Sequence, residues 1–421
     1  MWLCKSPGLL KKAKGEMGEW NSGTTTPACN HGLMGFGEED TVEKHFAYFG
    51  FANTTFFQHM EEKGYECYHP NIGPVNSAWD RVCILWAYLF GGRVDYGKVH
   101  AEKHGHARYG KYYPGVLKDL GQTEAHKKIN LLGHSFGGPT VKMAVTLFAY
   151  GSEEERNGTP PEELSPLFAG GHGDLIHSVT TLAGVNNGTA LASLFGKVPF
   201  SVVNYALMAL VTLVGDTPFT KFYDFGASQW GIMPFREDIS GWHFQNPLKH
   251  IAAARAFDRN KTFDNINREM QIEVIQEAFN PAMKYPENVY YFAQRAIGTK
   301  PGRNGNPVPD RKAMSLLCFI PGQITCRAML PRLAKYGLRS DPNWRACDGF
   351  VNLVGQSAPL DAKYEEADYD TDFKPGIWYN MPLERGDHIF WNGWLQPPEQ
   401  YDALYTRMMD LYRSLPDGED V

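Results

Sequence analysis

The stretch GHSFG at 133–137 has the pattern Gly-x-Ser-x-Gly, and it lies between the apolar run INLL and the helix-like run TVKMAVTLFAY. A serine at the tip of a tight turn from strand to helix projects its hydroxyl outward. Small residues two positions away on either side let strand and helix approach each other. The positive end of the helix dipole also favours negative charge at such a position. The pattern therefore indicates that Ser135 is a nucleophile.

Two other interpretations of GHSFG compete with the nucleophile. A phosphate-binding loop is disfavoured, because the chain contains no Gly-x₄-Gly-Lys-Ser/Thr pattern. An ordinary connection between a strand and a helix stays open on the pentapeptide alone. The choice therefore depends on whether the rest of the chain offers partners for a reactive serine.

A serine nucleophile needs a base, a carboxylate that orients the base, and N–H groups that bind the oxyanion. With Gly-x-Ser-x-Gly the expected chain order is Ser, Asp, His. WRACDGFVN places Asp348 at a turn, and LERGDHIFWNG places His388 in a glycine-flanked loop. Asp387 adjoins His388, but successive side chains diverge and cannot pair in this way. For the oxyanion hole we expect the backbone N–H of Phe136 and that of Leu33, in the glycine-rich stretch HGLMGFG.

A histidine-rich stretch, VDYGKVHAEKHGHARYG, contains His100, His104 and His106. Zinc accepts histidine nitrogen and aspartate oxygen in tetrahedral sites. A metal site here would need carboxylates from elsewhere, and Asp80 in NSAWDRVC is one option. A polar loop with solvated histidines is an equally good interpretation of these residues alone.

The composition limits which classes of protein this chain can belong to. The 421 residues carry a formal charge of −6 with 43% hydrophobic residues, which is typical of a globular protein with a large core. The mild acidity argues against a nucleic-acid partner. The seven scattered cysteines form no disulfide framework. We expect no signal peptide, because no apolar segment follows the N-terminal lysines. We also expect no transmembrane segment, because the longest apolar run, at 201–215, falls short of the roughly 20 residues that a bilayer span needs.

The order of elements predicts the fold class. YECYHP, KKINLLGHS, HSVTTLAG and NVYYFAQRA have strand character. SAWDRVCILWAYLFGG, PTVKMAVTLFAYG and PPEQYDALYTRMMDLYRSL have helical apolar spacing. Strands that alternate with helices predict a mainly parallel sheet covered by helices on both faces. Functional sites in such sheets lie at the carboxyl ends of the strands.

These motifs together resemble the bacterial true lipases of the Geobacillus and staphylococcal type. The matching stretches include HGLMGFG, GPVNSAWDRVC, GGRVDYGKVHAEKHGHARYG, INLLGHSFGGPTV, CDGFVN and GDHIFWNG. The resemblance covers most of the chain from residue 31 onward, and its histidine-rich stretch is the most specific part. It implies an α/β-hydrolase fold with an inserted zinc subdomain and a helical lid.

The resemblance also implies the roles of individual residues. Ser135 would be the nucleophile, His388 the base and Asp348 its orienting carboxylate. A structural zinc ion would be held by two histidines and two aspartates, outside the catalytic chemistry. Three positions match Asp80, His100 and His106, and we choose Asp258 as the fourth ligand with Asp264 as the alternative.

The implied organisation is a single hydrolase domain at 25–415, between an N-terminal tail at 1–24 and an acidic tail at 416–421. The zinc-bearing insertion would span about 80–110 and 225–265, and the lid about 189–225. The family has a strand before His-Gly, whereas TTTPACN predicts a short or missing first strand. The family's calcium ligands fall on Phe390 and Leu395, so no calcium site is expected.

The hypothesis is a serine lipase or carboxylesterase that hydrolyses acylglycerol-type esters at a lipid–water interface through an acyl-enzyme. The first alternative is an acyltransferase that uses the same triad. The second is a catalytically inactive, zinc-stabilised binding protein. The compartment stays open, because relatives of this type are exported and the chain shows no export signal.

Overall fold

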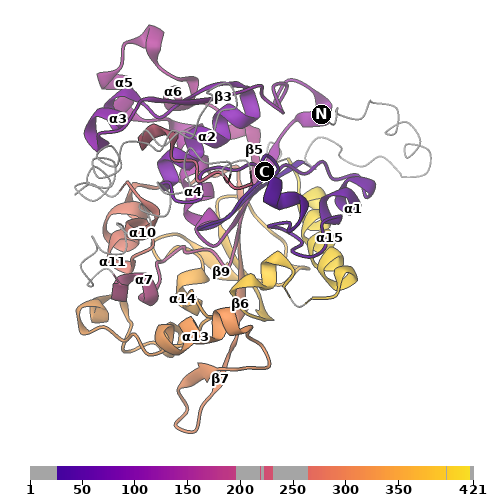
Figure 1. Cartoon of the computed structure of the whole chain (residues 1–421), viewed down its shortest axis with the longest axis vertical. Coiled ribbons are helices and arrows are strands. Elements are labelled where there is room, and N and C mark those ends of the chain that lie inside the picture. The colour runs from indigo at the N-terminus through magenta and orange to yellow at the C-terminus, as the bar shows by residue number, and fades with distance from the viewer. Residues whose placement is uncertain (1–25, 196–218, 220–221, 231–263, 395, 418–421) are drawn as a thin grey trace.

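A six-stranded sheet forms the centre of the molecule in the computed structural model, which describes residues 26–195, 219, 222–230, 264–394 and 396–417 (Figure 1). Its strand order is β1-β4-β5-β6-β10-β9, and every neighbouring pair is parallel. In that order the strands are β1 (Thr26–Asn30), β4 (Ile129–His134), β5 (Ile176–Leu182), β6 (Tyr290–Ile297), β10 (Trp378–Arg385) and β9 (Tyr364–Glu366). The predicted parallel sheet is therefore confirmed.

Two short antiparallel pairs lie outside this sheet. They are β2 (Gly92–Asp95) with β3 (Tyr109–Tyr113), and β7 (Thr299–Pro301) with β8 (Pro307–Pro309). The second pair folds the Gly/Pro-rich stretch GTKPGRNGNPVPDR into a hairpin that projects from the molecule (Figure 1).

Helices of very different lengths connect the strands. They are α1 (Phe56–Glu62), α2 (Ala78–Phe90), α3 (Lys98–His104), α4 (Gly137–Tyr150), α5 (Glu153–Gly158), α6 (Pro166–Ala169), α7 (Ala190–Phe195), α10 (Ile266–Glu269), α11 (Ile272–Val274), α12 (Asn280–Ala282), α13 (Leu316–Thr325), α14 (Leu353–Gln356) and α15 (Pro398–Ser414). None of the helices that the described residues form is long and apolar enough to cross a bilayer.

The sheet has a hydrophobic core on each face. Side chains of a strand alternate between faces, and β6 shows this directly. Tyr291 and Ala293 pack into a cluster with buried residues of α2 and α4. Tyr290 and Phe292 pack on the other side with α1 and α15. The apolar stripe predicted for the last helix, which includes Tyr405, is buried in this second cluster.

The first strand is present and five residues long, so of the two outcomes expected from TTTPACN the structure has the short strand. β1 lies at the sheet edge, and all five of its residues are buried. On its outer side the N–H of Cys29 donates to the carbonyl of Tyr68 at 2.7 Å. Pro27 faces the same outer side, so its missing N–H costs no bond to β4. The strand therefore tolerates proline, and it supports the loop that follows.

Other local predictions differ from the structure. YECYHP forms no strand of its own, but only an isolated bridge between Tyr68 and Ala28. The six cysteines of the described ranges are all free and buried. The predicted lid lies largely outside the described residues, so it and the domain boundaries stay predictions.

Candidate active site and metal centre

Ser135 sits on the tight turn between β4 and α4 that the sequence predicts. Its φ is +58°, a left-handed conformation that a residue with a side chain rarely adopts. A Cβ on Gly133 would lie 2.1 Å from the carbonyl oxygen of Gly137. A Cβ on Gly137 would lie 2.4 Å from the carbonyl oxygen of Asn30. Both glycines are required because the strand, the turn and the helix touch through their backbones.

The structure brings together the three side chains predicted as a triad. The Oγ of Ser135 lies 2.8 Å from Nε2 of His388, and Nδ1 of His388 lies 2.7 Å from Oδ2 of Asp348. His388 opens the 3-10 turn after β10, and Asp348 lies in the turn before α14. Asp348 is fully buried, while Ser135 and His388 are 8% and 7% exposed. These two hydrogen-bond contacts in series suit proton transfer from the serine hydroxyl to the imidazole.

Asp348 is held in place by the backbone around it. Its Oδ1 accepts hydrogen bonds from the N–H groups of Phe350 and Val351, and its carbonyl accepts from the N–H of His388. Asp387 points elsewhere, since its carboxylate accepts from the N–H groups of Ser315 and Ile389. The structure therefore agrees with the argument that successive side chains diverge.

The two N–H groups predicted as an oxyanion hole flank the serine. A Cβ on Gly32 would lie 2.7 Å from Cβ of Ser135, so the loop that carries Leu33 packs directly against the nucleophile. Within the described ranges, no acceptor takes the backbone N–H of Leu33 or of Phe136. Donors without a partner beside a nucleophile are available to a developing negative charge.

A polar chain that the sequence analysis missed connects this loop to the triad. The hydroxyl of Tyr48 accepts from the N–H of Gly32 at 2.8 Å and contacts Nδ1 of His134 at 2.8 Å. Nε2 of His134 lies 2.9 Å from the carbonyl of His388, so Nε2 donates and Nδ1 accepts. Burial, and secondarily nearby His388, hold the pKa of His134 well below its usual value. His134 was visible inside the pentapeptide, but nothing in the sequence pointed to Tyr48.

Two further buried side chains, those of Arg81 and His31, hold the His-Gly loop in place. The Nη2 of Arg81 donates to the carbonyl of His31, and its guanidinium lies 5.3 Å from the ring centre of Phe136. Burial lowers the pKa of Arg81 to about 9. His31 accepts from the N–H of Ile72 through Nε2 and donates to the carbonyl of Gly32 through Nδ1. These contacts fix the His-Gly loop against β4.

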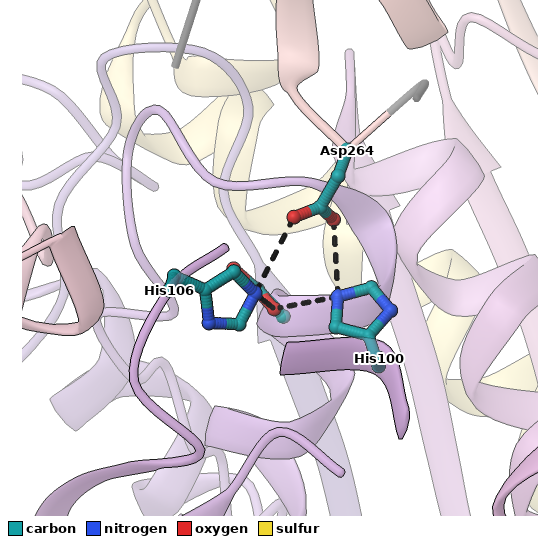
Figure 2. A group of neighbouring side chains, drawn as sticks. His100, His106 and Asp264 are labelled. Carbon is teal, nitrogen blue, oxygen red and sulfur yellow. Dashed lines mark ion pairs between the residues drawn. The ribbon is translucent and has the colours of Figure 1, made fainter. Parts of the chain in front are cut away.

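A second cluster gathers histidines and aspartates from α2, from the stretch 98–106 and from the start of the 264–394 range. Figure 2 shows His100, His106 and Asp264 pointing toward a common centre. The Nε2 of His100 lies 3.2 Å from Oδ1 of Asp264 and 3.4 Å from Oδ1 of Asp80. The Nε2 of His106 lies 3.5 Å from Oδ2 of Asp264. One ligand atom from each of the four residues fits within 4.8 Å of every other.

The donor set and its unsatisfied atoms fit a metal ion. Nε2 of His100, Nε2 of His106, Oδ1 of Asp80 and both oxygens of Asp264 are buried without a hydrogen-bond partner among the described residues. Zinc bonds of about 2.0–2.1 Å in a tetrahedron place ligand atoms about 3.3 Å apart, close to the distances found. Buried polar atoms without partners are costly, and a cation at their centre would satisfy all of them.

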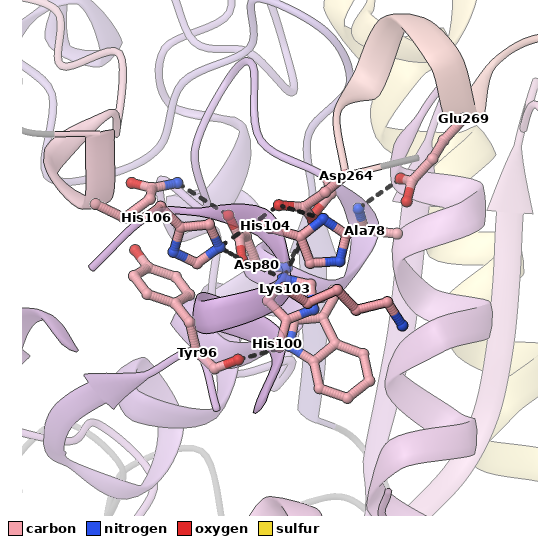
Figure 3. A network of polar contacts seen from close by, with 12 residues as sticks. Ala78, Asp80, Tyr96, His100, Lys103, His104, His106, Asp264 and Glu269 are labelled. Carbon is pink, nitrogen blue, oxygen red and sulfur yellow. Dashed lines mark hydrogen bonds and ion pairs between the residues drawn. The ribbon is translucent and has the colours of Figure 1, made fainter. Parts of the chain in front are cut away.

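Neighbouring groups orient the ligands, as Figure 3 shows for the network around them. Nδ1 of His106 contacts the carbonyl of Ala107 at 2.9 Å, which leaves Nε2 to face the centre. The ring of His100 stacks on Trp79, with ring centres 4.8 Å apart. Oδ2 of Asp80 accepts from the side-chain amide of Gln229 at 3.0 Å. Such supporting contacts are typical of metal ligands.

Three of the predicted ligands, Asp80, His100 and His106, come together in the structure. The fourth residue of the cluster is Asp264. This residue was the alternative in the sequence analysis. Asp258, the first choice, lies outside the described residues. Leu395, one of the two positions that matched calcium ligands in the family, also lies outside them, and the absence of a calcium site stays a prediction.

Comparisons with known proteins place this chain in a family. The family described as "Lipase-like, C-terminal domain" matches residues 26–397. Lipase 1 of Staphylococcus aureus is 29% identical over 395 residues, which is 92% of this chain and 53% of the relative. The chain therefore spans about half the length of the curated relatives that it matches.

Two solved structures are similar over almost their whole length. The lipase of Staphylococcus hyicus has a TM-score of 0.79 at 26% identity, covering 95% of this chain and 98% of its own. Lipase 1 of Pelosinus fermentans has a TM-score of 0.71 at 30% identity, covering 94% of this chain and 100% of its own. The predicted α/β-hydrolase fold is confirmed.

Proposed function

Because the chain belongs to the family of lipase-like C-terminal domains, we propose that it is a serine lipase or carboxylesterase that hydrolyses acylglycerol-type esters. The observation that supports this proposal best is the pair of contacts that join Ser135 Oγ to His388 at 2.8 Å and His388 to Asp348 at 2.7 Å. The unpartnered N–H groups beside it supply the second requirement of acyl transfer.

In the proposed reaction His388 removes the proton from Ser135 Oγ as the oxygen attacks the ester carbonyl. Asp348 holds the imidazole in the right tautomer and stabilises its positive charge. The N–H groups of Leu33 and Phe136 bind the oxyanion of the tetrahedral intermediate, an effect of about 3–4 kcal/mol per donor. When the intermediate collapses, the protonated His388 gives its proton to the leaving alcohol, and the acyl group stays on the serine.

Hydrolysis of the acyl-enzyme completes the cycle. His388 removes a proton from water, and the hydroxide attacks the acyl carbonyl. The second tetrahedral intermediate collapses with transfer of the proton back to Ser135 Oγ, which releases the fatty acid. An alcohol in place of water would make the enzyme an acyltransferase, and no feature of the described residues favours that acceptor over water.

We further propose a structural zinc ion bound by Asp80, His100, His106 and Asp264. A bound zinc ion would supply a closed tetrahedral anchor and take no part in ester chemistry. It would fix the start of α2 to the stretch 98–106 and to the start of the 264–394 range. The unsatisfied ligand atoms are the support for this part of the proposal.

The test is a comparison of Ser135→Ala with the native chain on a graded series of p-nitrophenyl esters, together with labelling by a fluorophosphonate probe. Ser178→Ala is the matched control, because Ser178 is also a buried serine and its hydroxyl donates to Asn130 on the neighbouring strand, away from the triad. Ser135→Ala is expected to lose turnover by at least about 10⁴-fold and to lose labelling, with an unchanged melting temperature. Persistent turnover in that variant, or a native chain that neither reacts with the probe nor cleaves any ester, would refute the proposal.

A further inference from the structure

The helix α13 exposes an unusual amount of apolar surface. Its sequence LLCFIPGQIT contains no charged residue. Large apolar side chains point into solvent along it: Leu316, Leu317, Ile320 and Ile324, with exposed fractions of 73%, 61%, 59% and 39%. At 3.6 residues per turn these positions fall within about 100° of arc, so they form one continuous stripe. We call these four side chains the α13 stripe. Contiguous exposed apolar surface on a globular protein marks an interaction site.

The opposite side of α13 is firmly packed. Cys318 is fully buried in a cluster with Met314, Cys326 and Cys347. A Cβ on Gly322 would lie 3.3 Å from the backbone of Gly349, so the helix backbone lies close to the turn that carries Asp348. The exposed stripe is therefore the outer face of a fixed helix.

Both ends of α13 are tied to the loops of the proposed triad. At the N-terminus, the N–H of Ser315 donates to Oδ2 of Asp387, the residue before His388, at 2.8 Å. At the C-terminus, the hydroxyl of Thr325 donates to the carbonyl of Gly349, the residue after Asp348, at 2.8 Å. A partner surface that binds the α13 stripe would consequently lie close to the loops that carry His388 and Asp348.

The charge around α13 differs from that of the rest of the chain. Residues 311–340 contain six basic residues and no acidic one, in a chain with a net charge of −6. Two of the six pair with acids, Arg332 with Glu273 and Lys335 with Glu277. The other four are exposed and form no ion pair within the described ranges: Arg311, Lys312, Arg327 and Arg339.

We propose that the α13 stripe docks the protein on an anionic lipid surface, with the apolar side chains in the interface and the flanking basic side chains against the headgroups. The choice of lipid rests on the proposed function, because an ester of low solubility must be reached where it forms a surface. An apolar face flanked by lysine and arginine binds such surfaces through apolar burial and electrostatic attraction together. The hairpin β7–β8 lies beside α13 at the same end of the molecule (Figure 1), and its loop carries one further exposed basic residue, Arg303.

The test uses full-length protein carrying Ser135→Ala, so that binding is measured without hydrolysis. Co-sedimentation is measured with vesicles of phosphatidylcholine alone and of phosphatidylcholine mixed with phosphatidylglycerol. The double substitution Leu317→Gln/Ile320→Gln is expected to weaken binding to the mixed vesicles by about tenfold or more. Leu360→Gln/Leu383→Gln is the matched control, because these leucines are also exposed, at 45% and 44%, and lie on other elements. The control is expected to bind like the parent.

The basic flanks are tested separately with Lys312→Gln/Arg327→Gln. This variant is expected to lose the preference for phosphatidylglycerol while keeping its weak binding to phosphatidylcholine. Added salt should reduce the binding of the parent protein to mixed vesicles more than that of this variant. Melting temperatures of all variants verify that each one is folded.

Two results would overturn the proposal. One is equal vesicle binding by the stripe variant and the leucine control. The other is a parent protein that dimerises through α13, so that the stripe variant becomes monomeric without any change in vesicle binding. Neither measurement depends on catalysis, so failure of the docking proposal is distinguishable from failure of the ester hydrolase proposal.

Discussion

The triad and the metal cluster are built from the same residue types, histidine and aspartate, yet their hydrogen-bonding states are opposite. In the triad each nitrogen of His388 has its own partner, Ser135 Oγ on one side and Asp348 Oδ2 on the other. In the cluster the nitrogens and oxygens converge and are left without hydrogen-bond partners among the described residues. The first arrangement suits proton transfer, and the second fits a cation. Residue type alone therefore does not assign a site, whereas the partner of each atom does.

The strongest test of the triad side of this comparison is Asp348→Asn. We expect kcat to fall by about 10⁴-fold, because the amide no longer stabilises the imidazolium and can hold the wrong tautomer. Asp387→Asn is the control, since that carboxylate is adjacent in sequence but bonds to Ser315 and Ile389. Steady-state kinetics on a soluble ester measure both, and equal losses would remove the distinction between the two carboxylates.

Tyr48→Phe tests whether the polar chain behind the triad positions it. The substitution leaves the N–H of Gly32 without its acceptor and Nδ1 of His134 without its donor. We expect kcat to fall by about 10- to 100-fold with little change in KM, the cost of one or two buried hydrogen bonds. Tyr223→Phe is the comparison, because Tyr223 bonds to Gly35 of the same loop but has no link to His134. A loss confined to KM, or an equal loss in both variants, would contradict a positioning role.

On the metal side, Asp264→Asn should abolish zinc binding, whereas Asp258→Asn should retain it. Metal analysis of the purified variants measures this directly. Zinc at a hundredfold excess over its Kd contributes about 2.7 kcal/mol, which for a chain of this size moves the Tm by about 3 °C. Chelation of the native chain should lower the Tm by a similar amount and change the turnover of a soluble ester far less. Loss of zinc in Asp258→Asn alone would reverse the ligand assignment.

Lys142 gives the smallest effect, and its buried side chain is hydrogen-bonded to two neutral oxygen atoms. Its Nζ donates to the carbonyl of Asn186 and to Oδ1 of Asn280, and burial lowers its pKa from 10.5 to about 7. The unfolded chain therefore binds more protons between pH 7 and 10.5, so this residue makes stability rise with pH there, by about 1 kcal/mol from pH 7 to 8. The rise fades below pH 7, as Lys142 becomes protonated in the folded state as well. Lys142→Met should remove it, as urea unfolding at several pH values would measure.

Sequence reasoning was most effective where a reactive residue and the backbone that positions it are adjacent in the chain. The pentapeptide around Ser135 predicted its own turn because the glycines, the strand and the helix are adjacent in the chain. Asp348 and His388 could be assigned as partners of Ser135 because they follow it in the expected order Ser, Asp, His and lie in turns or glycine-flanked loops. The sequence left open whether β1 is short or missing, since the tolerance of Pro27 depends on which side of the strand faces β4.

Contacts across long sequence separations were not predictable in the same way. Tyr48 is linked to His134 over 86 residues, and no local pattern marks the tyrosine. Asp264 and Asp258 are both acidic residues in one polar stretch, and only the spatial position of Asp264 relative to His100 separates them. The apolar content of LLCFIPGQIT suggests a buried helix, and the exposure of its outer face becomes visible only when its neighbours are known.

Both edges of the central sheet are closed to further strands. At one edge Pro27 has no N–H to offer, and the adjacent backbone of Cys29 is already bonded to Tyr68. At the other edge β9 is only three residues long, fully exposed, and carries Glu365 and Glu366. Short, charged or proline-bearing edges discourage edge-to-edge association between molecules. Copies of this chain crowded together at high local concentration therefore meet, among the described residues, little sheet edge through which they could pair.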